Sequence, residues 1–224
     1  MSIIPFLIER AQKETLRLIA RKFPDLFTGI AETRIIAAFL ESDQITMREY
    51  VIGLPPNEFR TRRSQVFLNL LGLSEQFSDE ITAMYVDQYP TINAPVKGAR
   101  EVIESLARRF RLGVISNGLP DVQYKKFDTL GIKLLLDCIV LSEELGVEKP
   151  NPEIFLHAVS LVGAAPGKSL YVGDSYEIDV VGAKKAGMQA CWFNPTGANP
   201  SRTDIKPNFE IQALDEMLTF LNCS

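Results

Sequence analysis

The sequence predicts an α/β protein in which a doubly wound, Rossmann-like parallel sheet follows an all-helical region. Two observations support this prediction. Apolar residues recur at helical spacing as far as Pro90, whereas short unbroken apolar runs alternate with helical stretches after it. Such runs are typical of strands in a parallel sheet that helices cover on both faces. We therefore expect a helical region over residues 1–88 and an α/β core over residues 89–224 of this 224-residue chain.

The helical region contains at least four amphipathic segments. Their apolar residues lie three and four positions apart: Leu16, Ile19, Ala20 and Phe23; Ile35, Ile36, Phe39 and Leu40; Val66, Phe67, Leu70 and Leu71; and Ile81, Met84 and Tyr85. Thr46 and Glu49 fit a capping box and predict a helix start, because each side chain can satisfy a free backbone amide of the other residue. Ser78, followed by Asp79 and Glu80, predicts another start.

The α/β core is predicted from a change of period. We expect helices at 98–110, 152–162 and 178–186, a last helix through 214–221, and strands at 112–115, 135–141, 170–172, 190–193 and 209–211. In doubly wound sheets, ligands bind where the strands end at their carboxyl edge. Polar clusters directly after these strands are therefore the candidate site.

The composition gives no electrostatic surface for nucleic acid or an anionic membrane. The chain has 24 Lys and Arg residues against 28 Asp and Glu residues, a formal net charge of −4, whereas both partners need clustered positive charge. Arg60, Arg62 and Arg63 are expected to form a solvated face, with a position near an anionic substrate as the alternative. The apolar run at 3–8 is interrupted by Pro5 and is too short for a membrane span. We expect a cytoplasmic protein with no nucleic-acid and no membrane partner.

Cysteine and histidine leave little material for a zinc site or a Ser-His-Asp triad. Cys138, Cys191 and Cys223 are odd in number and far apart, and the first two lie in apolar runs. They predict buried thiols in a reducing compartment rather than a disulfide framework. His157 is the single histidine of the chain, so neither site has its usual residues.

The first polar cluster is Ser116-Asn117-Gly118, which follows the 112–115 strand. It offers a hydroxyl and backbone N–H groups in a tight turn, which suits a phosphate oxygen. A plain strand-to-helix turn is the alternative interpretation.

The second cluster surrounds Lys149. Pro150 forces Lys149 into an extended backbone, while Asn151 caps the following helix and Pro152 begins it. An ammonium held at the sheet edge could neutralise phosphate oxygens during phosphoryl transfer. The alternative is a surface lysine in a proline-rich loop.

The third cluster contains two carboxylates. Asp174 stands at a strand tip, and Asp179 follows five residues later in the first turn of a helix. Two carboxylates beside a phosphate cradle suit Mg²⁺, which takes one or two protein oxygens and keeps waters and substrate oxygens. Alternatively, Asp179 complements the helix dipole and Ser175 caps the helix. Gly182 leaves room for close packing in that helix.

In this order, the three clusters resemble motifs two, three and four of the haloacid dehalogenase superfamily of hydrolases, with a close match over about residues 90–193. The helical region resembles the helical cap of that family. The resemblance implies that Ser116, Asn117 and Gly118 bind the substrate phosphate. It also implies that Ser116 and Lys149 take part in catalysis, that Lys149 neutralises the phosphate, and that Asp174 and Asp179 hold Mg²⁺.

The resemblance implies a magnesium-dependent phosphatase that acts on a small phosphorylated metabolite of phosphoglycolate or nucleotide type. Gly173-Asp174 favours phosphate-ester hydrolysis over 2-haloacid dehalogenation, because the family's dehalogenases need no metal and replace this pair. The first motif of the family, Asp-x-Asp after an apolar strand, has no counterpart in these 224 residues. Its aspartates act as nucleophile and as proton exchanger for the leaving group.

Two explanations of this difference are open. Either the reading frame starts late and the strand with the aspartates lies upstream, which we favour, or residues 3–8 form a degenerate first strand, although Pro5 suits a central strand poorly. We therefore expect an impaired phosphatase. A catalytically inactive relative that binds a phosphorylated ligand or a protein partner is the alternative, and an incomplete sheet would favour strand borrowing in a homodimer.

Overall fold

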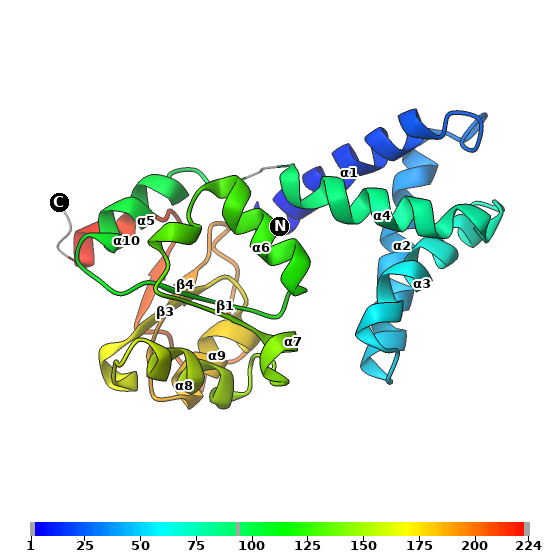
Figure 1. Cartoon of the computed structure of the whole chain (residues 1–224). Helices are drawn as coiled ribbons and strands as arrows, with labels where there is room; N and C mark the ends of the chain where they lie inside the picture. The colour runs from blue at the N-terminus through cyan, green and yellow to red at the C-terminus, as the bar shows by residue number, and fades with distance from the viewer. Residues whose placement is uncertain (1–2, 93–94, 222–224) are drawn as a thin grey trace. The chain divides into compact units, whose positions relative to one another are not determined.

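The computed structural model describes the backbone of residues 3–92 and 95–221, and the side-chain surroundings of these residues except 3–10, 51, 56 and 57. The chain divides into a helical unit, Glu9–Ile92, and an α/β unit that comprises Met1–Ile8 and Asn93–Ser224. Figure 1 shows the elements of each unit. The described helices include no stretch with the length and hydropathy of a membrane span.

The apolar spacing correctly predicts the helices of the helical unit. In the described residues these are α1 (Ile3–Lys22), which begins in the segment assigned to the α/β unit, α2 (Glu32–Val51), α3 (Pro56–Leu70) and α4 (Ser78–Gln88), with 3-10 turns at Glu75–Phe77 and Tyr89–Thr91. Their apolar faces share one core in which Ile19, Phe67 and Ile81 are fully buried. The ring centres of Phe39 and Tyr85 stack 5.0 Å apart in the same core.

One alternative and one expectation for this part of the chain are wrong. Residues 3–8 lie in the first turns of α1 instead of a strand, and Pro5 is tolerated there because the first turn of a helix has no partner for its N–H groups. The second error is the capping box, because α2 runs through Thr46 and the buried Thr46 hydroxyl donates to the Ser42 carbonyl at 2.7 Å. Packing of the apolar face of α2 overrides the local start signal.

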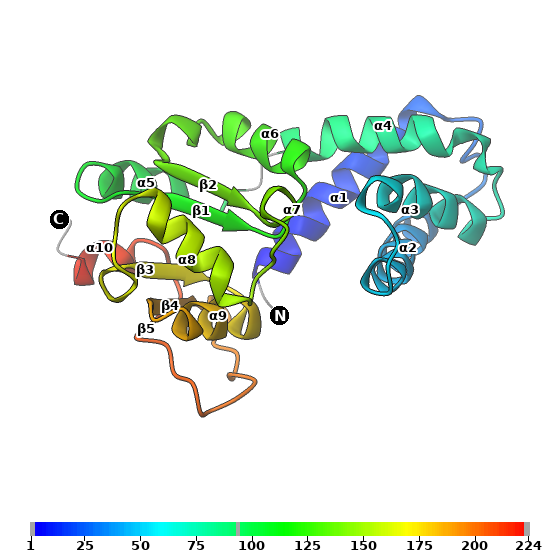
Figure 2. The same ribbon diagram turned by 60° about the horizontal axis from the view of Figure 1, so that its bottom comes forward.

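The α/β unit confirms the predicted fold class. Its strands are β1 (Gly113–Ser116), β2 (Cys138–Leu141), β3 (Leu170–Gly173), β4 (Gln189–Phe193) and β5 (Phe209–Ile211). Its helices are α5 (Ala99–Ala107), α6 (Pro120–Leu130), α7 (Ser142–Leu145), α8 (Pro152–Leu161), α9 (Val181–Lys185) and α10 (Glu216–Phe220), with a π-helical turn at Tyr176–Val180 and 3-10 turns at Lys133–Leu135 and Pro166–Lys168. Figure 2 shows helices on both sides of the strands.

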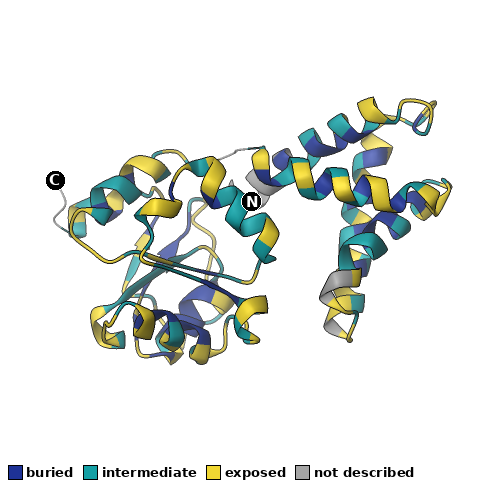
Figure 3. Cartoon of the chain, viewed as in Figure 1, coloured by how far each residue is buried: buried dark blue, intermediate teal, exposed yellow. Residues whose placement is uncertain are grey.

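All the strand pairs are parallel, but the strands form two sheets. β1 pairs with β2, and β3, β4 and β5 pair in that order. No backbone ladder joins β1 to β3 within the described residues. One hydrophobic core nevertheless spans both sheets, because Ile115 of β1, Val140 of β2 and Trp192 of β4 share it with residues of α8 and α9. Figure 3 shows this buried layer.

The sequence analysis missed helix α6. Among the described residues, Phe127 is the one buried residue of this helix, so its apolar stripe is too weak to show a helical period. Its ends did carry signals, since Pro120 occupies the first turn and Gly131 ends the helix with a left-handed φ of 65°. The helix completes the crossover from β1 to β2 that a parallel pair requires.

Candidate active site

The candidate site begins at the carboxyl end of β1, where Asn117 fixes the backbone of Lys149. The Asn117 side chain accepts a hydrogen bond from the Lys149 N–H at 2.9 Å and donates one to the Lys149 carbonyl at 3.0 Å. This two-way contact joins residues 32 positions apart. The side-chain amide of Asn117 is therefore engaged with the protein through both its oxygen and its nitrogen.

The Lys149 side chain is largely buried, and its ionic partner is Asp179. The Lys149 ammonium lies 2.8 Å from Asp179 Oδ1, and only 12% and 5% of the two side chains are exposed. The ammonium also contacts the Tyr171 hydroxyl at 2.9 Å. Lys149 is thus held inside the α/β unit, and the alternative of a surface lysine in a proline-rich loop is wrong.

Both carboxylate oxygens of Asp179 are engaged. Oδ1 accepts hydrogen bonds from the Lys149 ammonium at 2.8 Å and from the Tyr171 hydroxyl at 3.3 Å. Oδ2 accepts one from the Ser175 backbone N–H at 3.0 Å. The side chain of Ser175 makes no capping hydrogen bond at this helix start, so the carboxylate of Asp179 supplies the cap instead. Asp179 acts here mainly as the anchor of Lys149.

Gly173 is required where β3 ends. A Cβ atom built at Gly173 would overlap the Cβ, Cγ and Oδ2 atoms of Asp179. A side chain at this position would therefore push Asp179 away from Lys149. The glycine of the Gly-Asp pair has a packing role that the sequence alone did not reveal.

Asp174, the next residue, has a different environment. It is exposed, its carbonyl accepts the indole N–H of Trp192 at 3.0 Å, and its carboxylate stays outside the Lys149–Asp179 pair. Although part of the residue is exposed, the surrounding protein removes water from the Asp174 carboxyl, and this desolvation is the larger cause that raises its pKa. The nearby negative charge of Asp179 raises the pKa further. An added cation would relieve this repulsion.

The donor set fits Mg²⁺ in a limited way. The described residues contain no cluster of three or more His, Cys, Asp or Glu side chains for a metal. Asp174 offers one carboxylate that no other described side chain bonds, and Asp179 offers a second that is already hydrogen-bonded. Mg²⁺ accepts one or two protein carboxylates when waters and substrate oxygens complete its shell. Zinc and calcium sites need more protein ligands.

Ser116 lies at the end of β1, next to Asn117. Its hydroxyl accepts the Gly118 N–H at 3.1 Å, which makes a local turn. A Cβ atom at Gly118 would overlap the Gln123 side chain, so this glycine keeps the turn close to α6. The structure thus joins Asn117, Lys149 and Asp179 directly, while Ser116 and Asp174 are attached through chain neighbours.

The role of Tyr171 was not predicted from the sequence, and the prediction that Arg63 is solvated is wrong. Tyr171 lies in β3 within an apolar run, which gave no reason to assign its hydroxyl to the site. Arg63 is buried instead of solvated, with its guanidinium 4.3 Å from the ring centre of Tyr85 and 3.2 Å from the Asp43 carboxylate. Arg62 pairs with both carboxylate oxygens of Glu49. These arginines therefore have structural partners within the helical unit.

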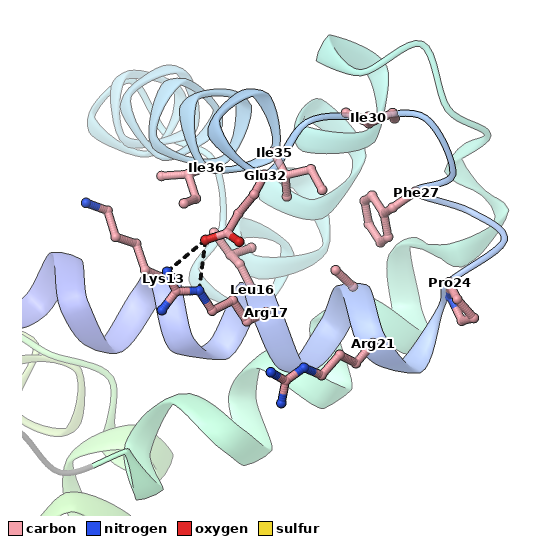
Figure 4. Close-up of a pocket in the computed structure, with 11 residues that line it drawn as sticks. Lys13, Leu16, Arg17, Arg21, Pro24, Phe27, Ile30, Glu32, Ile35 and Ile36 are labelled. Atoms are coloured by element: carbon pink, nitrogen blue, oxygen red, sulfur yellow. Dashed lines mark hydrogen bonds and ion pairs between the residues drawn. The ribbon is translucent and has the colours of Figure 1, made fainter.

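A separate pocket of about 500 Å³ lies between α1 and α2. Figure 4 shows its apolar wall, which includes Phe27, Ile35 and Ile36, and the Arg17–Glu32 ion pair across it. None of the predicted site residues lines it. All the residues that line this pocket belong to the helical unit.

Comparison with known proteins gives the family. A model described as haloacid dehalogenase-like hydrolase matches residues 39–193. Glyceraldehyde 3-phosphate phosphatase of Methanopyrus kandleri is 36% identical over 137 residues, which are 60% of this chain and 56% of that protein. Pyrimidine 5'-nucleotidase YjjG of Escherichia coli is 30% identical over 140 residues, 62% of this chain and 61% of the relative. The matches therefore span little more than half the length of these relatives.

Solved structures share the fold. The HAD-hydrolase YfnB of Bacillus subtilis, solved with magnesium, has a TM-score of 0.77 and 25% identity and covers 96% of this chain and 92% of its own. A 2-haloacid dehalogenase from Pseudomonas syringae has a TM-score of 0.69 and 23% identity over 96% and 91%, which supports the fold alone. With the family model matched over more than half of its length, this chain belongs to the haloacid dehalogenase-like hydrolases.

Proposed function

We propose that this α/β unit is the core of a magnesium-dependent phosphatase for a small phosphorylated metabolite. The observation that carries the proposal is the buried Lys149 ammonium, fixed by Asp179 at 2.8 Å beside the exposed Asp174. A positioned cation next to a free carboxylate suits a phosphate and its metal ion. The relatives named for glyceraldehyde 3-phosphate and pyrimidine nucleotides support a small phosphorylated substrate.

In this proposal the residues have separate roles. The Ser116 hydroxyl and the Asn117 backbone N–H donate to phosphate oxygens, and Lys149 neutralises charge on the phosphate. Gly118 contributes to the phosphate-binding turn through its N–H, which donates to the Ser116 hydroxyl oxygen at 3.1 Å and orients it. Asp174 holds Mg²⁺, with Asp179 at its side. Bound Mg²⁺ would supply charge neutralisation at the phosphate. Ser116 and Lys149 act as catalytic residues by orienting the phosphate, since neither is placed as a nucleophile.

The nucleophile decides how active this chain is. The 224 residues contain no Asp-x-Asp, so we propose that the chain alone turns over phosphate esters slowly. A protein that binds a phosphorylated ligand or a protein partner without hydrolysis is the second candidate, favoured by the same absence beside a complete Lys149–Asp179 pair. A 2-haloacid dehalogenase is the third and weakest candidate, because Asp174 follows Gly173.

Hydrolysis of p-nitrophenyl phosphate, with Mg²⁺ and with chelator, tests the first candidate. The expected result is slow, magnesium-dependent turnover that is lost in Asp174→Ala and Lys149→Met. Turnover that survives Asp174→Ala would contradict the assignment. Binding of inorganic phosphate and Mg²⁺ without turnover would favour the second candidate, and halide release from 2-chloropropionate would favour the third. Glu153→Ala, an exposed change in α8, is the matched control.

A further inference from the structure

We propose that Tyr171 is a positioning residue that fixes the Lys149 ammonium so that one N–H group is left for an anionic ligand. This inference rests on the proposed phosphate site and assigns a new residue to it. Tyr171 belongs to β3 and joins three other segments of the α/β unit, since its hydroxyl lies near Lys149, Asp179 and the Ile115 carbonyl.

The first step is a count of hydrogen-bond donors. A lysine ammonium has three N–H donors and no acceptor. One is used by Asp179 Oδ1 at 2.8 Å and a second by the Tyr171 hydroxyl oxygen at 2.9 Å. Among the residues whose side chains are described, one donor therefore remains without a partner, and its direction is set by the other two. Without the Tyr171 hydroxyl, the ammonium would rotate about its single contact with Asp179.

The second step concerns the single proton of the Tyr171 hydroxyl. The hydroxyl accepts from Lys149, so its own O–H is free to donate. Two acceptors lie at equal distance, Asp179 Oδ1 and the Ile115 carbonyl, each at 3.3 Å. Ile115 directly precedes Ser116 in β1. Tyr171 therefore ties the strand that carries the predicted phosphate-binding turn to the cation and its carboxylate.

The third step is that the tyrosine ring itself is fixed. Phe155 of α8 packs edge-on against Tyr171, with 4.9 Å between ring centres and 80° between ring planes. Phe155 is fully buried, and it approaches the backbone at Gly182, where an added Cβ would lie 2.6 Å from its ring. Because Phe155 already fixes the Tyr171 ring, the Tyr171 hydroxyl stays directed at Lys149, and ligand binding costs no further side-chain entropy at Tyr171.

Tyr171→Phe removes the hydroxyl and keeps the ring. Lys149 reactivity is measured by reductive methylation of the full chain, with the modified lysine located by mass spectrometry. We expect Lys149 labelling to rise about tenfold, because one hydrogen bond to a charged group is lost. Tyr124→Phe is the matched control, since it removes a tyrosine hydroxyl that bonds only Glu144 among the described residues. Trp192 emission establishes that each variant is folded.

Binding of inorganic phosphate with Mg²⁺ is measured in parallel by calorimetry. Where the wild-type chain binds phosphate, Tyr171→Phe should weaken binding by about tenfold while Tyr124→Phe leaves it unchanged. Unchanged Lys149 labelling in Tyr171→Phe would overturn the inference whatever the binding result, and so would unchanged phosphate affinity. A wild-type chain that binds no phosphate would instead overturn the proposed function, and the labelling would still decide the role of Tyr171.

Discussion

Each unit of this protein holds a largely buried cation beside an aspartate, and the two cations have different surroundings. In the helical unit, Arg63 lies 3.2 Å from Asp43, with 10% and 35% of the side chains exposed. In the α/β unit, Lys149 lies 2.8 Å from Asp179, with 12% and 5% exposed. Both pairs adjoin a tyrosine. The two cationic side chains are exposed to a similar extent. The pairs differ in the exposure of the aspartate and in the groups that surround the cation.

Arg63 is enclosed by aromatic rings. Its guanidinium lies 4.3 Å from the ring centre of Tyr85 and 4.9 Å from that of Phe39, and burial raises the pKa of Tyr85. Its Nε atom is buried without a hydrogen-bond partner. A planar cation between ring faces is suited to holding helices together. The Lys149 ammonium instead contacts oxygen atoms of Asp179 and Tyr171. Arg63 therefore serves helix packing, whereas Lys149 can still donate a hydrogen bond to a ligand.

The largest expected effect comes from removing the more buried aspartate. Asp179→Ala would leave the Lys149 ammonium buried and unpaired, and it should lower the free energy of unfolding by about 3–5 kcal/mol. Asp43→Ala should lower it by about 1 kcal/mol, because water can reach Arg63 through the more exposed site. Urea unfolding followed by Trp192 emission reports the α/β unit, and far-ultraviolet circular dichroism reports the helices. Equal losses would show that aspartate burial is not what separates the two pairs.

The next effect tests the close packing behind Lys149. Gly182→Ala would place a Cβ atom 2.6 Å from the Phe155 ring and 3.1 Å from Pro150 Cα, and it should destabilise the α/β unit by about 1–3 kcal/mol. Gly167→Ala is the matched control, since no atom outside its own neighbours lies within 4 Å of the added Cβ. The urea midpoint of Trp192 emission measures both. An unshifted midpoint in Gly182→Ala would mean that Phe155 can move aside freely.

A smaller effect is expected from a charge-preserving change in the helical unit. Arg63→Lys keeps the charge but loses the planar contact with Tyr85 and Phe39, and it should cost about 1 kcal/mol. Arg62→Lys, whose side chain is 40% exposed, should cost less. Thermal unfolding by circular dichroism compares the two variants. If Arg62→Lys were the more damaging change, the ring contacts of Arg63 would not be its main contribution.

The smallest effect should come from a third cation–aspartate pair, which lies at the surface. The side chains of Arg111 and Asp137 are 75% and 28% exposed. The hydrogen bond from Arg111 is the largest cause that lowers the pKa of Asp137 below its ordinary value of 3.8, and the hydrogen bond from the Leu112 N–H is the second. The unfolded chain then binds this proton more tightly, so the stabilisation is present above pH 3.8 and is lost as the pH falls through the folded pKa.

Asp137→Asn should therefore lower the unfolding midpoint slightly at neutral pH and leave it unchanged in acid. Midpoints of the wild-type chain and the variant, measured across this range, give the comparison. A difference that grows toward acid would reverse the sign of the linkage. If Asp137→Asn destabilised the protein as much as Asp179→Ala does, burial would not explain the different contributions of the three ion pairs.

The sequence predicted the strands and most helices because their apolar residues repeat with a clear period. It also marked Lys149, Asp174 and Asp179, since Lys149 precedes a proline, Asp174 follows a glycine at a predicted strand end, and Asp179 lies in the predicted first turn of the next helix. Helix α6 was missed because its buried stripe is narrow. The local signal at Thr46 failed for the opposite reason, as a continuous apolar face carried α2 through it.

The partners of the site residues were beyond the reach of the sequence. Asn117 meets the Lys149 backbone, and Tyr171 meets the Lys149 side chain, across 32 and 22 positions. Neither residue differs locally from an ordinary turn asparagine or strand tyrosine. Arg63 failed in the same way, because the rings that enclose it come from α2 and α4. Contacts between distant segments depend on the whole fold, whereas period and turn chemistry are local.

The division of the strands into two sheets has a consequence for how this molecule behaves at high concentration. β1 and β3 each have a flank without a backbone ladder in the described residues, and a free flank of this kind is a template for another extended segment. Apolar residues such as Ile115 and Val172 belong to these strands, so an apolar peptide is the segment expected to pair with them. Aggregation that increases with protein concentration, and that a short apolar peptide in excess suppresses, is the expected behaviour.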